Sequence, residues 1–197
     1  MRILLLTGWL LLPVVGAAWH YGPGQERMQL DRVASILAEA DQAAAAEQWA
    51  QADESYAEAL RLLPLDRVAE ARRVRLERAK AQMLAKKLPI AHQELKGLVQ
   101  EMESDPSADP ALLAESRAAL ANAQYYTTWL MRLEGYQRED WEPEIEAARQ
   151  NFRLLAEQAE ARGDEAGLKK LEEDLESTIR LARMDLAELQ GLPLPSQ

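Results

Sequence analysis

The chain of 197 residues contains no cysteine. Disulfides, thiol nucleophiles and thiolate metal ligands are therefore excluded. This absence does not identify the compartment, because many exported helical proteins have no disulfides. Phenylalanine occurs once, glycine and proline occur nine times each, and β-branched residues are sparse. Alanine and leucine, the strongest helix formers, supply much of the apolar content, so the composition favours an all-α domain.

Positive charge is also in short supply, since the net charge is -10 at pH 7. An acidic protein repels the phosphate backbone, which disfavours nucleic acid as a partner. Hydrophobic residues make up 48% of the chain, which is enough for a core. The length suits a single domain.

The longest uncharged run lies at the N-terminus, in residues 3–18, directly after Arg2. Two interpretations of this run stay open. A cleaved signal peptide would place the small residues 16–18 before its cleavage site. An uncleaved anchor would cross the membrane through residues 3–21.

The aromatic residues Trp19 and Tyr21 would lie at the outer membrane interface if the run is an anchor. In both interpretations residues 1–24 form the signal peptide or anchor with a hinge. Arg2 stays in the cytoplasm, and the rest of the chain lies on the extracytoplasmic side.

Residues 25–191 show helical periodicity almost throughout, because apolar residues recur at alternating spacings of three and four. The stripes predict about seven helices, the last of them continuing to Leu189. Short connections force neighbouring helices to pack antiparallel, so we expect one domain built of helical hairpins. Residues 192–197 are expected to form a disordered tail.

Helix boundaries are marked by capping residues and prolines. We expect N-caps at Asp66, Asp109 and Asp164, prolines in first turns at Pro89 and Pro110, and a left-handed C-terminal glycine at Gly163.

One segment, residues 49–64, carries a recognisable spacing in Trp49, Ala52, Tyr56, Ala59, Leu60 and Pro64. Together with the helix before it, this segment resembles a tetratricopeptide (TPR) repeat over residues 33–66. Small residues let two helices approach closely, while aromatic rings fill the groove beside them. Further along the chain, the same spacing recurs loosely in Leu88, Ala91, Leu95 and Leu98.

This resemblance implies a short α-solenoid of antiparallel hairpins after an N-terminal hydrophobic helix. It also implies a non-catalytic scaffold that binds another protein or peptide. A helical bundle without repeats is the alternative fold.

No pattern in the sequence predicts catalysis. His20 and His92 each lack a second ligand at metal-binding spacing. Gly22 and Gly24 lack the lysine of a phosphate-binding loop. We therefore expect no enzyme activity, no cofactor and no metal site.

A basic segment stands out in this acidic chain. Arg72 and Arg75 lie on one side of a predicted helix, and arginine binds carboxylates in a two-pronged geometry. These two residues are therefore predicted to bind an acidic segment of a partner. The alternative is intramolecular pairing with neighbouring glutamate-rich helices.

An aromatic cluster provides the second candidate binding surface. Tyrosine, tryptophan and arginine dominate the energetic centres of protein interfaces. Packing in the core is the alternative for the same side chains. The candidates are Tyr125, Trp129, Arg132, Tyr136 and Trp141.

The predicted function is thus that of a membrane-anchored interaction scaffold facing outside the cytoplasm. The alternative is a self-associating helical bundle or a structural spacer of an envelope assembly. It is suggested by the heptad-like stripes in residues 145–159 and 168–189. The sequence does not predict an oligomeric state.

Overall fold

The structure is a computed structural model that describes residues 23–191. This part of the chain contains eight helices and no strand. They are α2 (Pro23–Ala45), α3 (Trp49–Leu62), α4 (Val68–Leu84), α5 (Leu88–Glu103), α6 (Pro110–Leu133), α7 (Arg138–Ala161), α8 (Glu165–Arg183) and α9 (Leu186–Gln190).

The predicted signal or anchor and the predicted tail, residues 192–197, lie outside the described residues. Among the helices between residues 23 and 191, none is long and apolar enough to cross a membrane.

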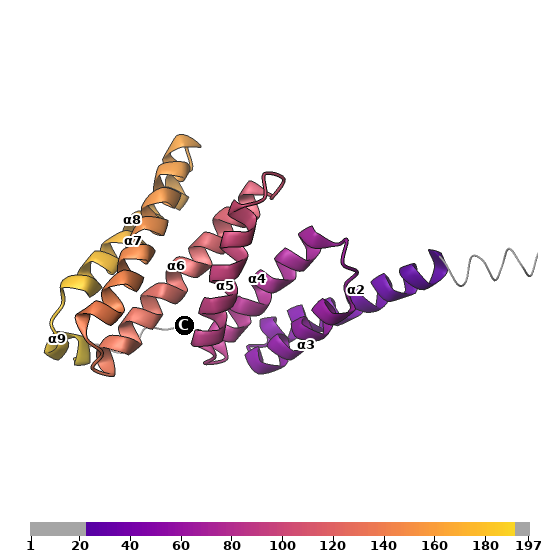
Figure 1. Cartoon of the computed structure of the whole chain (residues 1–197), viewed down its shortest axis with the longest axis horizontal. Helices are drawn as coiled ribbons and strands as arrows, with labels where there is room; N and C mark the ends of the chain where they lie inside the picture. Colours follow the sequence, from indigo (N-terminus) through magenta and orange to yellow (C-terminus); the bar gives the residue numbers. More distant parts are fainter. Residues whose placement is uncertain (1–22, 192–197) are drawn as a thin grey trace, which may run out of the picture.

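The helices form a row of hairpins, seen in Figure 1 from indigo α2 at one end to orange α8 at the other. Each helix from α2 to α8 packs against its neighbours in sequence. Two further contacts join α4 to α6 and α6 to α9. The expected all-α class and the hairpin arrangement are confirmed.

The first hairpin is held together by alanines at the contact between α2 and α3. Ala40, Ala52 and Ala59 are fully buried there. Tyr56 is also buried, and its hydroxyl donates to Asp41 over 2.6 Å. A methyl group in place of a long side chain lets the helix axes approach, so the ring of Tyr56 can fill the remaining space.

The spacing of α3 recurs in the second helix of each later hairpin. Ala52 of α3, Ala91 of α5 and Ala148 of α7 all have no exposed surface. One turn further on, Tyr56 corresponds to a leucine in α5 and to a phenylalanine in α7, and both are buried. The equivalent core positions are Leu88, Ala91, Leu95 and Leu98 in α5, and Ile145, Ala148, Phe152 and Leu155 in α7.

Most predicted helix boundaries are confirmed. Asp109 accepts a hydrogen bond from the Ala111 N–H at 2.9 Å, and Asp164 accepts one from Gly167 at 2.9 Å. Gly163 has a φ of 69°, in the left-handed region that glycine adopts without strain.

The predicted N-cap at Asp66 is wrong. The turn after α3 closes with a 3.0 Å hydrogen bond from the Arg67 N–H to the Pro64 carbonyl, so α4 starts one residue later. Arg67 occupies the N-cap position without a side-chain bond.

The continuous last helix is also a wrong prediction, and it explains why eight helices are found instead of seven. The chain leaves the helical conformation at Met184, whose ψ is 144°. Asp185 then caps α9 by accepting a hydrogen bond from the Glu188 N–H at 2.7 Å. The short α9 turns back and packs on α6.

Candidate binding surfaces

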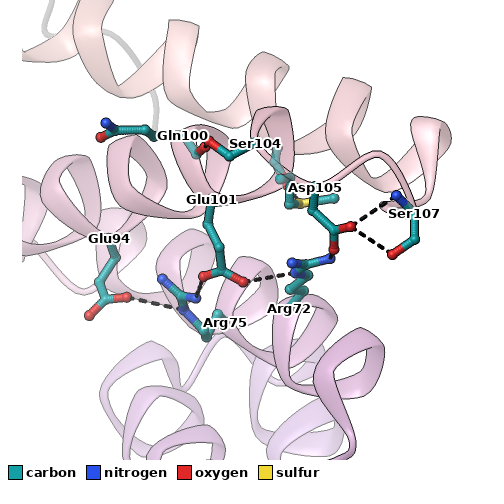
Figure 2. A network of polar contacts seen from close by, with 10 residues as sticks. Arg72, Arg75, Glu94, Gln100, Glu101, Ser104, Asp105 and Ser107 are labelled. Atoms are coloured by element: carbon teal, nitrogen blue, oxygen red, sulfur yellow. Dashed lines mark hydrogen bonds and ion pairs between the residues drawn. The ribbon is translucent and has the colours of Figure 1, made fainter.

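The two arginines predicted to bind a partner are paired within the chain (Figure 2). Arg72 of α4 is buried and donates to Glu101 over 2.8 Å and to Asp105 over 2.7 Å. Arg75 donates to the other oxygen of Glu101 over 2.6 Å, and it lies 3.6 Å from Glu94. A partner's carboxylate would thus compete with Glu101 of α5 and Asp105 of the following loop for these guanidinium groups.

The charges of this network favour its paired state. The Ser107 hydroxyl and N–H and the Arg72 guanidinium lower the pKa of Asp105 to about 2. Burial alone would raise the pKa of Glu101, but hydrogen bonds from Arg72 and Arg75 outweigh it and lower that pKa. Both carboxylates are thus ionised at neutral pH, and the network joins α4 to α5 and the loop after it.

A second part of the basic segment surrounds Asp53, a nearly buried carboxylate on α3. It accepts hydrogen bonds from Arg78 at 2.8 Å, Gln82 at 3.0 Å and Lys87 at 2.7 Å. Burial would raise the pKa of Asp53, but the bonds from Lys87, Arg78 and Gln82 lower it overall. The basic side chains here hold α3 against α4.

The centre of the aromatic cluster is also inside the protein. Trp129 and Trp141 are buried in one apolar cluster with Leu181 and Leu189. Tyr125 packs at the edge of this cluster, with its ring centroid 6.0 Å from that of Trp129. Core packing, the alternative named for these side chains, is therefore what the geometry shows for the two tryptophans.

Arg132 is buried and donates to backbone carbonyls, a role that the sequence did not indicate. Its guanidinium lies 4.7 Å from the centroid of the Trp141 ring. It donates to the Leu181 carbonyl and, over 2.5 Å, to the Met184 carbonyl. Burial lowers the pKa of Arg132. A buried cation thus binds the last carbonyls of α8, where the helix dipole is negative.

Tyr136 is the one predicted aromatic site residue with a largely exposed side chain, at 52% exposure. It follows Gly135 in the loop between α6 and α7. The structure therefore does not bring the seven predicted site residues together: two lie between α4 and α5, four at or beside the C-terminal cluster, and Tyr136 on a loop.

An apolar groove lies elsewhere, between the first helices of two successive hairpins. This α4–α6 groove has a volume of about 410 Å³. Apolar side chains form most of its lining, and the ion pair between Lys80 and Glu115, 2.5 Å long, crosses it from helix to helix. The lining residues are Lys80, Met83, Leu84, Glu115, Ala118, Ala119, Asn122 and Tyr126.

The sequence contained a signal for this groove. Ala118, Asn122 and Tyr126 follow one another at a spacing of four, on a side of α6 that is only half-buried. A second stripe on a helix indicates a second neighbour or a ligand. The contribution of α4 carries no comparable pattern, because Met83 and Leu84 are ordinary core residues by sequence.

A second hollow, of about 740 Å³, lies on α3. Its lining is polar and carries both signs of charge, including Glu54, Glu58, Arg61 and Arg78. Arg78 already donates a hydrogen bond to Asp53. Ala57 and Leu60 are the apolar residues of this lining, whereas apolar side chains form most of the lining of small binding sites.

The described residues contain no group of three histidine, cysteine or acidic side chains that could hold a metal ion. One histidine does pair with an acidic residue: Nε2 of His92 in α5 lies 3.2 Å from a carboxylate oxygen of Glu144 in α7. The His92 contact is the first cause of a lowered pKa of Glu144. This pair joins α5 to α7.

No protein-family model matches the chain, and no curated protein sequence matches it.

Proposed function

We propose that this protein is a non-catalytic, TPR-like scaffold that binds a segment of another protein in the α4–α6 groove. Three second helices with the same core spacing, centred on Ala52, Ala91 and Ala148, support the TPR-like assignment. In such a stack, the first helices of successive hairpins line one continuous face. The α4–α6 groove lies between two first helices, which is the observation that carries the proposal.

The chemistry of the groove defines the segment it would take. Met83, Leu84 and Ala118 offer apolar contacts, while Asn122 offers an amide that can donate and accept. Lys80 and Glu115 neutralise each other across the groove. The expected ligand is therefore an uncharged, apolar stretch. An acidic peptide is less well matched, because Arg72 and Arg75 already bind Glu101 and Asp105.

The proposed location is the extracytoplasmic face of a membrane, with residues 3–21 as the anchor. The support is the uncharged run after Arg2 and the following helical domain of acidic character. Protease added to the outside of intact membranes should digest residues 25–191. Protection of that domain from external protease would place it in the cytoplasm and overturn the proposed topology.

The binding surface is tested by affinity capture of the tagged full-length protein from membranes. Ala118→Arg places a long charged side chain in the groove at little cost in helix propensity. Ser55→Arg makes a matched change at a half-buried position in the polar hollow of α3. We expect a partner that is captured by the wild type and by Ser55→Arg, and at least ~10-fold less by Ala118→Arg.

Circular dichroism of all three proteins checks that they are equally folded. Equal capture of the partner by a folded Ala118→Arg variant would show that the groove is not the binding surface.

Self-association is the second candidate function. It is favoured by α8, at the end of the row, where Leu168, Leu171, Leu175 and Ile179 are only half-buried. Sedimentation of the full chain in detergent at increasing concentration distinguishes the two. A monomer at every concentration argues against self-association, and a concentration-dependent dimer supports it.

A further inference from the structure

We propose that the chain's own residues 192–195 occupy the α4–α6 groove and compete there with a partner. The inference rests on the groove named in the proposed function, but it requires no knowledge of the partner. Its starting point is the direction in which α9 takes the chain. Instead of packing on α8 as a second helix of the last hairpin, α9 contacts α6.

The end of α9 is fixed on the C-terminal part of α6. Leu189 is 1% exposed and belongs to the same apolar cluster as Trp129. Arg132 binds the carbonyls of Leu181 and Met184, the residues that lead into α9. Gly191 is therefore held close to the helix that forms one wall of the groove.

The following residues can reach the groove from that point. Trp129 and Ala118 are about three turns apart on α6, which corresponds to about 16 Å. An extended proline-rich segment advances about 3.1 Å per residue. Residue 196 would thus lie about 16 Å from Gly191, beside Ala118, if the segment runs along α6 toward its N-terminus.

Apolar side chains lie on α6 between the cluster around Trp129 and the groove at Ala118. Leu130, with 38% of its side chain exposed, lies one turn from Tyr126 on α6. Tyr126 in turn lies one turn from Asn122 in the groove. The exposed side of α6 between the C-terminal cluster and the groove is therefore lined with apolar and aromatic surface.

The composition of the segment matches this surface. It carries no charge, although 28% of the whole chain is charged, and its residues are Leu192, Pro193, Leu194 and Pro195. Alternating prolines favour an extended conformation before binding, so little conformational entropy is lost on docking. Aromatic-lined grooves commonly bind such proline-containing segments, and Tyr126 supplies the ring here.

Three occupants could compete for the groove: this segment, the same segment of a second copy, and a partner protein. The attachment at Gly191 favours the first. A short tether gives its end an effective concentration in the millimolar range, about 1,000-fold above that of a second copy at micromolar protein.

The absence of cysteine from the chain makes a clean cross-linking test possible. The full-length double variant Ala118→Cys/Ser196→Cys retains all four apolar residues of the segment. We expect it to form an intramolecular disulfide under mild oxidation, seen as a faster-migrating monomer on a non-reducing gel and as the linked peptides by mass spectrometry. The control pair, Ser55→Cys/Ser196→Cys, places the acceptor thiol on α3.

The segment's apolar residues are tested in the same background by adding Leu192→Asp and Leu194→Asp. These changes leave the tether length unaltered, so a disulfide formed by random encounter would persist, whereas docking through the leucines would be lost. We expect the cross-linking rate to fall at least ~10-fold, to the level of the control pair.

Three results would overturn the inference: a rate for the Ala118 pair no higher than for the Ser55 pair, unchanged cross-linking with the two aspartates, or a covalent dimer as the main product. The dimer would assign the groove to a second copy. A disulfide in the absence of any captured partner would sustain the inference while the proposed function failed, and a captured partner without the disulfide would show the reverse.

Discussion

The first hairpin and the C-terminal part of the molecule join their helices by different means. Between α2 and α3, fully buried alanines bring the helices together, and the Tyr56 hydroxyl bonds to Asp41. Around α6, α8 and α9, the buried guanidinium of Arg132 binds backbone carbonyls and covers the Trp141 ring.

The hairpin whose helices pack through alanines is not where the candidate binding groove lies. The alanines between α2 and α3 are fully buried, and the hollow on the outside of α3 is lined mostly by polar and charged residues. The apolar groove lies instead between α4 and α6, the first helices of the second and third hairpins. The apolar groove thus lies outside the part of the chain that most resembles a TPR repeat.

The largest expected effect tests whether the hairpins share one packing scheme. Phe152→Ala removes a ring with 2% exposure from the position in α7 that corresponds to Tyr56 in α3. The cavity should lower the free energy of unfolding by about 3–5 kcal/mol, and Tyr56→Ala should cost a similar amount. Urea denaturation followed by circular dichroism measures both. A cost below ~1 kcal/mol for either would show that the two positions are not equivalent.

The next effect concerns the C-terminal part alone. Arg132→Met keeps the apolar stem but removes the donors to the Leu181 and Met184 carbonyls, so we expect a loss of about 2–3 kcal/mol. Amide exchange should rise in α9. The exposed Arg138, paired with Glu142, gives a matched control, and Arg138→Met should change stability by less than ~0.5 kcal/mol. If α9 exchanges no faster in Arg132→Met, the proposed anchoring of the chain end is wrong.

Local signals in the sequence predicted most of the fold. Caps at Asp109 and Asp164 act within a few residues, and the buried stripes follow directly from helical spacing. The break after Arg183 was missed because the apolar stripe continues through it. Asp185 followed three residues later by Glu188 is a capping-box pattern that could have indicated the new helix.

The candidate site was less predictable, because its contacts are long-range. Arg72 meets Asp105 across the α4–α5 hairpin, and Arg132 meets Met184 across two helices. Composition identified these arginines as unusual but could not give their partners. The groove depends on the spacing between α4 and α6, which no pattern within one helix encodes.

The contact between α3 and α4 should depend on pH, because it is built around the carboxylate of Asp53. Because the folded-state pKa of Asp53 is lowered, its stabilising contribution is fully present above the unfolded value near 3.8 and is lost as the pH falls below that value. Asp53→Asn should therefore lower the free energy of unfolding by about 1–3 kcal/mol near neutral pH.

The deficit of this variant should shrink as the pH falls from about 4 toward 2, because the wild-type carboxylate becomes protonated. Urea titrations of both proteins over this range measure the difference. A deficit that is constant with pH would mean that the charge of Asp53 does not contribute to the contact.

The smallest effect tests the single hydroxyl in the first hairpin. Tyr56→Phe removes the 2.6 Å hydrogen bond to Asp41 and should cost about 1 kcal/mol in thermal or urea unfolding. Tyr136→Phe, at an exposed tyrosine, should be neutral within ~0.5 kcal/mol. Equal costs for the two variants would show that the hydroxyl of Tyr56 does not add to the packing of its ring.

That partners bind the α4–α6 groove is tested most directly by oxidative footprinting with and without a captured partner. The protein used is the full-length Leu192→Asp/Leu194→Asp variant, in which the chain's own segment no longer fills the groove. We expect the partner to protect Leu84 and Tyr126 in the groove, while the exposed Met28 of α2 and Tyr136 of the α6–α7 loop keep their reactivity. Protection confined to α2 or α3, with Leu84 and Tyr126 unchanged, would contradict binding in the groove.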